Sequence, residues 1–563
     1  MRKFYLCFFI ILFQSELFSE DLEKVVWPLE QRLPISGSFA EFRNTHLHMG
    51  CDFKTYGING FPVLAVFGGH LSSLSYSEFG YGLTFWLSSA SGKLSARYAH
   101  LHDLKGEVPG LDEFRNAMLL LGNREGFSVR LKPGLFSVKQ GMKSARSGET
   151  GSGVSHLHLE IFNGQKMLNP LGLADYWQKD ITPPEIQTVY ADSEAGSYSL
   201  TFKKVSEKLF VIEGAPILKV HGPVKIRIGG YDIMTSPKNK NNVFRLSAEM
   251  KGRQIFQKVL DAMTAAEASK KETLYDINKS SLSPPMYVYN FFSPEKNAYT
   301  FHSRDLGDKT ETLKFSLGDA SGNVSNAEIR FAEAGNSEKV QKQKTETSYS
   351  SADRNFSLDF SRNIVTGNGG VVISEVKDLP ENAKKEGFIP SGKMYHVTAG
   401  DFVWKGDARG TIGTEAGGAD SAVYVYDFGF GSWLPLKTVR KGKSMEFYFV
   451  RTGIFAVMQD KSPPRIGFPY LLYRDYYLPD LKTPEMTEKF YEISDLGSGI
   501  APGMTVLLEG AYYPYEYDTD RSFIRIEIPN SFSRYKKNLM IQIQVKDKAG
   551  NKSDWFTDFV KLK

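Results

Sequence analysis

Two stretches of the chain repeat the same turn and proline signals, and this repetition limits the folds that the sequence can adopt. Residues 180–186 (DITPPEI) resemble residues 460–466 (DKSPPRI), and residues 319–325 (DASGNVS) resemble residues 547–553 (DKAGNKS). Paired prolines force an extended chain and cannot donate to a ladder, so they suit a domain junction before an edge strand. Asp, Gly and Asn supply turn conformations between strands. The repeats predict two β-sandwich modules with related ends.

The composition also favours strands and turns over helical bundles. The 563 residues include 28 Tyr, 40 Phe and 51 Gly, and aromatic residues make up 13% of the chain. Aromatic side chains are enriched in strands, and Gly is enriched in turns. A chain of this length exceeds what one hydrophobic core supports, so we expect roughly three to five domains.

The N-terminus has the features of a secretory signal. Arg2 and Lys3 precede an apolar run over residues 4–13, and the small residue Ser19 follows. This order is typical of a signal peptide that is removed from the mature protein. The run is too short to span a bilayer, and no later segment is long and apolar enough to do so. We expect residues 1–19 to be removed, leaving a protein of the periplasm or cell envelope, or a secreted one, without stable membrane insertion.

Charge and cysteine usage exclude two further classes. The net charge of +5 is mild for this length and no basic stripe is visible, so nucleic acid is not an expected partner. Removal of the signal takes away Cys7 and leaves Cys51 alone, and one cysteine makes no intrachain disulfide. Stability must therefore come from hydrophobic cores or from a bound metal.

The chain divides into a first unit and a series of β-rich units. The first unit shows short strands between glycine turns, with a helix expected over residues 111–121, where Asp112 and Glu113 lie near its start. Polar residues without periodicity have the composition of a linker. We expect a first domain over 20–180, a β-sandwich over 181–332, a linker over 333–354, a β-rich domain over 355–458 and a second β-sandwich over 459–563.

Histidines gather in the first unit. Of ten in the chain, the seven before residue 160 are His46, His48, His70, His100, His102, His156 and His158. Structural histidines on a surface would scatter along the chain, so this clustering predicts a metal or catalytic site in the first domain.

The most ordered histidine pattern is in residues 155–162 (SHLHLEIF). Alternate side chains of a strand share a face, so His156, His158 and Glu160 are expected on one face and the leucines on the other. Two imidazoles on Cα atoms ~7 Å apart can reach one metal. The preceding residues 148–153 (GETGSG) form a flexible turn that lets the backbone approach the site.

A second block supplies further metal-ligand types. In residues 43–52 (RNTHLHMGCD), His48 and Asp52 are four apart, and Gly50 between them has no side chain to obstruct their convergence. Two histidines and one carboxylate are a zinc ligand set that leaves a position open for water. His46 is a rival to His48, and the spacing does not decide between them.

The third block, residues 98–103 (YAHLHD), places His100 and His102 two apart, on one face of an expected strand. A hydrolytic metal site also needs a base to take a proton from water and a donor for the oxyanion. Histidines beyond the metal ligands can supply both roles.

Taken in order, the three blocks resemble the LytM/lysostaphin-type zinc endopeptidases, which cut peptide bonds in bacterial peptidoglycan. The resemblance covers residues 28–175 and rests on a His-x-x-x-Asp block, a Tyr-Ala-His-Leu block and a His-Leu-His block after a small-residue turn. It implies a mainly β protein, with an antiparallel β peptidase domain of the LytM type followed by Ig-like β-sandwich modules.

The resemblance also assigns roles to residues. It implies one zinc ion held by His48, Asp52 and His158, which favours His48 over His46, and it makes His100 and His156 the two catalytic histidines. Arg43 and His46 become possible substrate contacts. Two departures are Ser155, where proline is usual, and a long segment over residues 104–138. Beside Asp52, Cys51 is expected to be a small buried hydrophobe rather than a ligand.

The function expected from these features is that of an exported zinc metalloendopeptidase that hydrolyses peptidoglycan stem or cross-link peptides during cell-wall remodelling. Peptidoglycan is then the expected partner, with a cell-envelope protein as a possible second partner of the C-terminal β domains. One alternative is a non-catalytic LytM-like scaffold that activates or positions another cell-wall hydrolase. Another is an adhesin in which residues 181–563 do the work.

Overall fold

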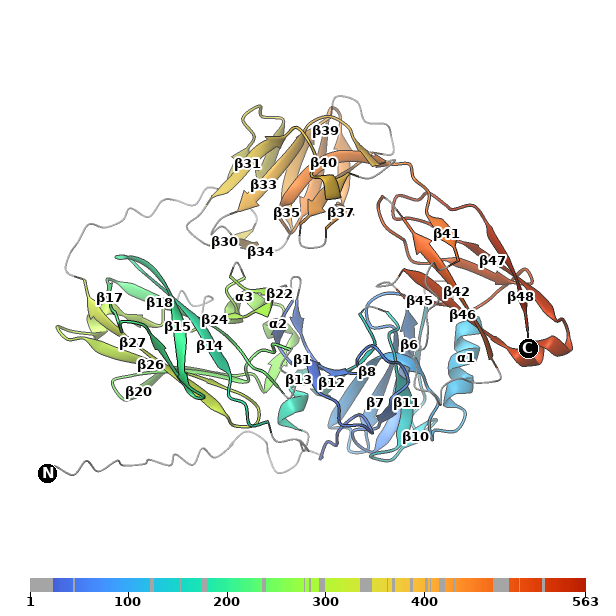
Figure 1. Cartoon of the computed structure of the whole chain (residues 1–563), viewed down its shortest axis with the longest axis horizontal. Helices are drawn as coiled ribbons and strands as arrows, with labels where there is room; N and C mark the ends of the chain where they lie inside the picture. Colours follow the sequence, from blue (N-terminus) through green and yellow to red (C-terminus); the bar gives the residue numbers. More distant parts are fainter. Residues whose placement is uncertain are drawn as a thin grey trace.

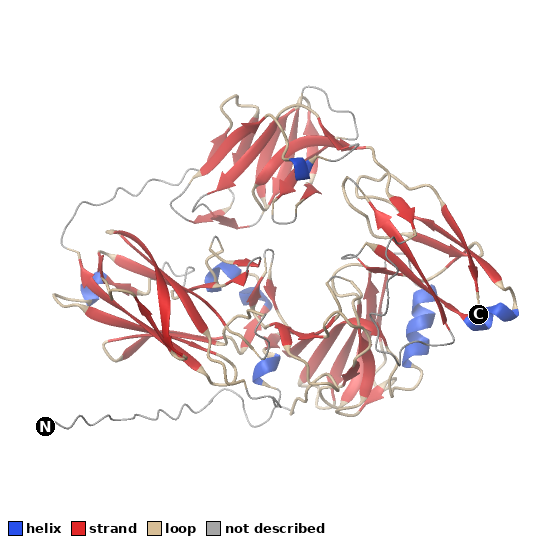
Figure 2. Cartoon of the chain, viewed as in Figure 1, coloured by secondary structure: helices blue, strands red, loops and turns tan. Residues whose placement is uncertain are grey.

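The computed structural model describes most of the chain and confirms the mainly β fold class, with antiparallel pairing throughout most of its sheets (Figures 1 and 2). The predicted signal peptide and residues 335–346 of the predicted linker lie outside the described residues. Those described are 24–43, 46–121, 126–151, 153–173, 180–234, 239–277, 279–282, 285–292, 299–334, 347–361, 363–366, 370–384, 388–399, 403–405, 407–414, 421–428, 431–468, 486–495, 497–518 and 522–562.

A twelve-stranded sheet carries the first unit. Apolar residues alternate along its central strand, so Leu157, Leu159 and Ile161 are buried in the core. In sheet order the strands of its main path are β1 (Ile35–Gly37), β4 (Cys51–Lys54), β12 (His156–Asn163), β8 (Leu94–Asp103), β7 (Leu83–Ser89), β6 (Gly69–Ser77) and β10 (Ser137–Val138).

The helix expected in the first unit is α1, which spans Leu111–Leu121. Asp112 lies in its first turn and accepts a hydrogen bond from the backbone N–H of Leu104 at 3.0 Å. Arg115, one turn later, pairs with Asp112 at 3.0 Å. These contacts fix the helix against the loop that follows β8.

The repeated sequence signals lie where strands begin and turn. The proline pairs precede β14 (Glu185–Ser193) and β41 (Arg465–Gly467), and the DxxGN segments connect β26 (Glu311–Gly318) to β27 (Val324–Glu333) and β47 (Asn538–Gln544) to β48 (Phe556–Lys561). The turns therefore occupy matching places in the second and the last unit.

Each later unit is built from antiparallel strands around an apolar core. In the second unit, strands β14 to β20 and β24 to β27 form an eleven-stranded sheet. In the next unit a five-stranded and a six-stranded sheet enclose Phe356, Phe447 and Phe455, with ring centroids 5.4–5.8 Å apart. In the last unit two four-stranded sheets enclose Ile524, Ile541 and other apolar residues.

The first two units are joined by strand pairing and by a shared core. β13 (Lys166–Leu168) pairs with β21 (Ala262–Thr264), so a strand from the predicted 181–332 range extends the first sheet. Two short helices follow, α2 (Ala265–Ala268) and α3 (Lys271–Leu274). The apolar cluster that begins in the first unit continues into the second.

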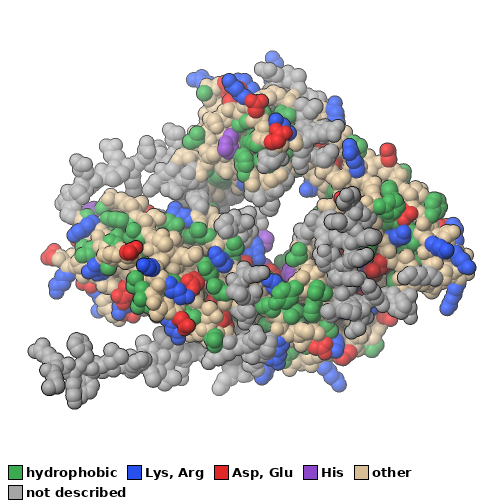
Figure 3. Space-filling model, viewed as in Figure 1, with side chains coloured by type: hydrophobic (Ala, Val, Ile, Leu, Met, Phe, Trp, Pro, Cys, Tyr) green, Lys and Arg blue, Asp and Glu red, His purple; other side chains and the backbone are tan. Residues whose placement is uncertain are grey.

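The last unit contacts the first unit from the other side. Glu78 accepts hydrogen bonds from the backbone N–H of Gly503 at 2.9 Å and from the Tyr515 hydroxyl. Gly151, in the turn before β12, forms an isolated parallel bridge with Asp518. In Figure 1 the four units surround a central opening, and in Figure 3 some of the purple histidine side chains border that opening.

None of the helices in the described part of the chain combines the length and the apolarity needed to cross a bilayer.

We predict that Asn242→Ala weakens the junction between the first two units. Asn242 is buried, its backbone N–H donates to Ser38 Oγ at 3.1 Å, and its side-chain amide donates to the carbonyl of Phe39 at 2.9 Å. Loss of the side chain leaves buried partners unsatisfied and should cost about 1–3 kcal/mol of unfolding free energy, measured by denaturant unfolding. The exposed Asn326→Ala should change it by less than about 0.5 kcal/mol; equal effects would contradict the prediction.

Candidate metal centre

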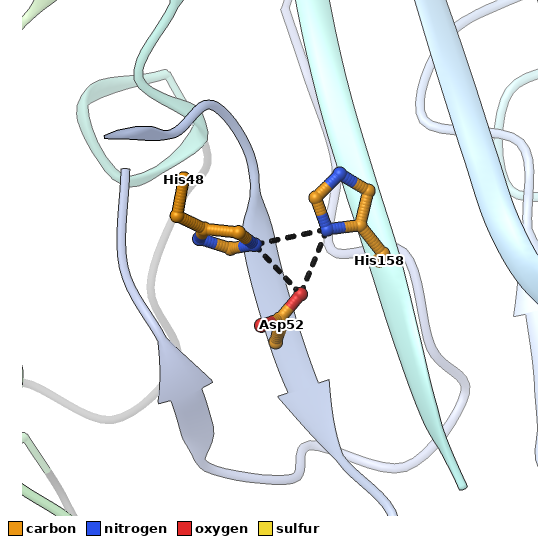
Figure 4. Close-up of side chains that lie close together, drawn as sticks. All are labelled: His48, Asp52 and His158. Atoms are coloured by element: carbon orange, nitrogen blue, oxygen red, sulfur yellow. Dashed lines mark hydrogen bonds and ion pairs between the residues drawn. The ribbon is translucent and has the colours of Figure 1, made fainter. Parts of the chain in front are cut away.

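Three side chains from two blocks of the first unit converge on one point (Figure 4). His48 Nε2 lies 3.0 Å from Asp52 Oδ1 and 3.0 Å from His158 Nδ1, and His158 Nδ1 lies 2.8 Å from Asp52 Oδ1. His48 and His158 are buried, and Asp52 is nearly so. The structure thus brings the three sequence-predicted ligands together, with one ligand atom of each no more than 3.0 Å from those of the other two.

Strand register produces this convergence. β4 and β12 are antiparallel neighbours, and Asp52 is the direct cross-strand partner of His158. Side chains of such a pair lie on the same face, a few ångströms apart. His48 is supplied by β3 (Leu47–His48), which pairs with β2 (Glu41–Phe42) and is joined to β4 through Met49 and Gly50.

Gly50 is required by the packing of this turn. A Cβ atom at Gly50 would lie 2.5 Å from the carbonyl oxygen of Leu159 and 2.8 Å from Cε1 of His158. Both distances are shorter than van der Waals contact, and one partner is backbone that cannot move aside. The absence of a side chain between His48 and Asp52 is therefore a steric condition for the site.

Hydrogen bonds on the far side of each imidazole fix its tautomer. His48 Nδ1 lies 2.9 Å from the carbonyl oxygen of Ser38, and His158 Nε2 lies 3.0 Å from Glu160 Oε1. A ring nitrogen that donates to a carbonyl or carboxylate leaves the other nitrogen with its lone pair. The nitrogens that keep their lone pairs, His48 Nε2 and His158 Nδ1, are then the two that lie beside Asp52 Oδ1.

Glu160 is itself held in place by a network. It is fully buried, accepts a hydrogen bond from the Tyr81 hydroxyl at 2.9 Å and pairs with Arg97. Burial raises the pKa of Glu160, but the bond from His158 and the charge of Arg97 outweigh it and lower the pKa to about 2. Glu160 is an anion at neutral pH and orients His158 as a carboxylate–histidine pair does in metal sites.

The sequence contained a signal for Glu160, because the alternation in residues 155–162 put it on the face of His158. It gave no signal for Arg97 or Tyr81 as partners of Glu160. They come from β8 and from the turn before β7, and only the sheet order brings them beside β12.

The electrostatics of the centre favour a positive charge. Burial alone would raise the pKa of Asp52, but the imidazoles of His48, His156 and His158 lower it well below its usual range. Burial lowers the pKa of His158, yet the carboxylates of Asp52 and Glu160 raise it to about 9. A cation at this point is therefore stabilised by two carboxylates on opposite sides of His158.

His100 and His156 lie beside the three-residue cluster and not within it. Their ring centroids are 4.4 Å apart, and His156 Nε2 lies 3.6 Å from Asp52 Oδ1. His156 Nδ1 is 2.7 Å from the carbonyl oxygen of Val154, and His100 Nδ1 is 2.9 Å from that of Thr150. Both carbonyls accept the Nδ1 proton, so Nε2 is the proton-accepting atom of each ring.

Both histidines are neutral at pH 7. Burial lowers the pKa of His100 to about 3, and the nearby charges of His156 and His158 act in the same direction. Burial also lowers the pKa of His156. A neutral imidazole with a free Nε2 can take up a proton, which is the property that a general base needs.

A β-bulge aims His100 at the site. Tyr98 is paired with Leu159 on the core face and Ala99 with His158 on the site face, so regular alternation would send His100 into the core. The β7–β8 register shifts by one residue here, and His100 has a φ of +58°. Such left-handed backbone is strained for a residue with a side chain and is concentrated at functional sites.

The remaining predicted residues lie at different distances from the centre. Arg43 Nη2 is 3.8 Å from Asp52 Oδ2 and also pairs with Glu41, so it borders the carboxylate. His46 is exposed and lies outside the three-residue cluster. Cys51 is fully buried in the core behind the site, and burial raises the pKa of its thiol well above the usual value.

His102, the second histidine of residues 98–103, contacts the last unit. His102 Nδ1 lies 3.3 Å from Arg525 Nη1 of the last unit, and burial lowers the pKa of His102 to about 3. His100, by contrast, lies against the ring of His156.

The donor set fits zinc. Two imidazole nitrogens and one carboxylate oxygen are ligands that zinc prefers, and their separations of 2.8–3.0 Å are close to the ~3.3 Å expected for ligand atoms at tetrahedral positions around this ion. A carbonyl and a carboxylate hold the histidines from behind, as is usual in such sites.

Comparisons with known proteins give only partial likenesses. No family model and no curated protein matches the chain. Among solved structures, Csd3 of Helicobacter pylori is 22% identical over 27% of this chain and 33% of its own, with a TM-score of 0.19. The catalytic domain of the antimicrobial peptidase lysostaphin from Staphylococcus simulans is 24% identical over 25% of this chain and 80% of its own, with a TM-score of 0.16.

LytU is 20% identical over 27% of this chain and 81% of its own, with a TM-score of 0.17. The matched part thus spans about a third of the length of Csd3. Identities below 25% with TM-scores below 0.5 do not identify a function, and the functional argument depends on the geometry of the site.

We predict that Gly50→Ala disrupts the centre. The added methyl group would meet His158 and the Leu159 carbonyl, so zinc affinity should fall at least about tenfold, measured by competition with a chromophoric chelator. The matched control is Gly68→Ala in the same domain, where the nearest atom to the added Cβ lies at 3.6 Å and φ is ordinary. Undiminished zinc affinity in Gly50→Ala would show that the turn has more room than the structure indicates.

Proposed function

We propose that the first unit is a zinc metalloendopeptidase that hydrolyses peptide bonds in peptidoglycan stem or cross-link peptides, in a protein exported to the periplasm or cell envelope. One observation carries the proposal. The cluster of His48, Asp52 and His158 lies beside two neutral histidines, His100 and His156, whose Nδ1 protons are committed to carbonyls. Metal ligands and proton acceptors that meet at one point are what metal-assisted hydrolysis requires.

The residues of the cluster would hold one zinc ion. When bound, zinc supplies Lewis acidity to the scissile carbonyl and lowers the pKa of water. The tautomers set by Ser38 and Glu160 present the correct nitrogen of each histidine, and Arg43 neutralises part of the charge on Asp52. These residues keep the centre rigid and its charge balanced.

His156 and His100 would move the protons. With Nδ1 bonded to a carbonyl, Nε2 of one ring accepts the proton released by the attacking water and delivers it to the leaving amine. The other ring would take up a solvent proton on Nε2 as negative charge develops on the oxyanion, donate a hydrogen bond to it, and return that proton to solvent when the oxyanion collapses. His156 Nε2, at 3.6 Å from Asp52 Oδ1, is already adjacent to the metal position.

The substrate class rests on the sequence. The ordered His-x-x-x-Asp, Tyr-Ala-His-Leu and His-Leu-His blocks and the predicted signal peptide support a cell-wall substrate outside the inner membrane. His46 is exposed and Arg43 is partly so, at the edge of the cluster, and both are proposed to contact substrate. The later β units are proposed to position the enzyme against peptidoglycan or a cell-envelope protein.

We predict that a metal-ligand variant and a catalytic-histidine variant differ in zinc content, although both lose cleavage. His158→Ala should lose both bound zinc and cleavage of a defined cross-linked muropeptide, followed by mass spectrometry. His156→Ala should keep zinc and lose about 10²–10⁴-fold in rate, which is the range for a general acid–base group. The exposed His46→Ala should keep zinc, because His46 lies outside the cluster, and as the loss of a substrate contact it should lower the rate less than His156→Ala does.

The muropeptide cleavage assay also distinguishes an enzyme from a non-catalytic scaffold. A purified protein that binds zinc and cleaves no bond, with or without a chelator, would contradict the endopeptidase proposal and would favour a scaffold for another hydrolase. Cleavage that stops on chelation and returns with zinc supports the enzyme.

We predict that activity persists into mildly acidic solution. A lowered pKa means that His100 and His156 lose their protons at a lower pH than an ordinary histidine, so the proton-accepting form survives below pH 6.5. A histidine of ordinary pKa would cause about a tenfold loss between pH 7.5 and 5.5. The rate at saturating zinc should fall less than that, and a full tenfold loss centred near pH 6.5 would contradict the assignment.

A further inference from the structure

Three aspartates, two in the second unit and one at its entry, form a cluster separate from that of His48, Asp52 and His158. Asp180 precedes the proline pair, Asp232 follows β18 (Pro223–Tyr231), and Asp319 begins the turn after β26. One carboxylate oxygen from each lies within 4.8 Å of the other two. The three residues are 6%, 2% and 5% exposed, so the charges are withdrawn from solvent.

Two of these carboxylates have an oxygen without a partner. Asp180 Oδ2 and Asp232 Oδ1 are buried and accept no hydrogen bond, and no lysine or arginine of the described ranges forms an ion pair with any of the three residues. A buried carboxylate that is unpaired is costly, and neighbouring carboxylates add mutual repulsion. Three ionised carboxylates are unfavourable here unless a cation lies among them or one of them takes up a proton. Burial raises the pKa of each, and the neighbouring carboxylates raise the pKa of Asp232 and Asp319 further.

The positions of the carboxylates are nevertheless fixed by neutral donors. Asn323 donates from its backbone N–H to Asp319 Oδ1 at 2.8 Å and from its side chain to Asp319 Oδ2 and to the carbonyl of Asp180, both at 2.7 Å. The backbone N–H of Thr182 donates to Asp180 Oδ1 at 3.0 Å. These bonds orient Asp180 and Asp319, and one oxygen of each of the three carboxylates lies within 4.8 Å of the other two.

We propose that Asp180, Asp232 and Asp319 bind one calcium ion. The donors are oxygen atoms only, with neither histidine nor cysteine among them, and hard cations prefer such sites. Calcium accepts carboxylates from irregular positions at flexible coordination numbers, whereas magnesium demands near-octahedral geometry and keeps several waters. The ion would tie together the chain entering β14, the end of β18 and the turn between β26 and β27.

The last unit has a similar cluster of three aspartates. Asp460, Asp495 and Asp547 also offer oxygens within 4.8 Å, and Asn551 donates to Asp547 and to the Asp460 carbonyl as Asn323 does in the second unit.

Backbone N–H groups already satisfy part of that second cluster. Ser498 donates to Asp460 Oδ2, and Gly497 and Gly499 donate to Asp495 Oδ2, at 2.6–3.1 Å. The shared design supports a cation role for the aspartates of the second unit, and we confine the proposal to that unit.

The test compares Asp232→Asn with Asp308→Asn in the full-length, zinc-loaded protein. Asp232→Asn keeps the shape of the side chain and removes its charge, whereas Asp308 is exposed in a turn of the same unit and serves as the matched control. Bound calcium is counted by equilibrium dialysis and elemental analysis. Wild type and Asp308→Asn should hold one more calcium ion per chain than Asp232→Asn.

Thermal unfolding gives a second readout that survives a failure of the variant to fold. Millimolar calcium should raise the melting temperature of wild type and Asp308→Asn, because a ligand that binds only the folded state stabilises it, and magnesium at the same concentration should raise it less. Without calcium, Asp232→Asn should melt at or above wild type, because one buried charge is gone. Equal calcium counts in wild type and Asp232→Asn, or no response of wild type to calcium, would overturn the proposal.

Discussion

The candidate site depends on one cross-strand pair. The antiparallel register of β4 and β12 sets Asp52 opposite His158, and every other component is placed relative to that pair. A slip of β12 by one residue would turn His158 to the core face, because the side-chain period of a strand is two. The apolar residues on either side of His158, Leu157 and Leu159, resist such a slip because it would take them out of the core.

Buried charge is the second theme of the molecule. The first unit withdraws Glu160 from solvent and balances it with Arg97 and His158, and it brings two carboxylates around a point that favours a cation. The second unit buries a group of aspartates, of which Asp180 and Asp232 have oxygens without partners. Neutral backbone and amide donors orient the aspartates of the second unit, whereas in the first unit a backbone carbonyl orients His48 and the Glu160–Arg97 pair orients His158.

Local patterns predicted much of this correctly. The alternation in residues 155–162 put His156, His158 and Glu160 on one face, and α1 has the bounds that its sequence indicated. The position of His100 could not be obtained that way, because a bulge with a left-handed residue reverses the local alternation. His102 contacts Arg525 of the last unit, a residue more than four hundred positions away that no local pattern indicates.

Sequence by itself determined the β-rich class, the related ends of two modules and the residue types of a metal centre, because these depend on local periodicity and turn chemistry. Only the tertiary structure decided which histidine nitrogens face the centre, that β21 joins the first sheet, and that Asp180, Asp232 and Asp319 form a group. The physical reason is that these facts depend on strand order and register, and residues far apart in the chain become neighbours only through long-range pairing.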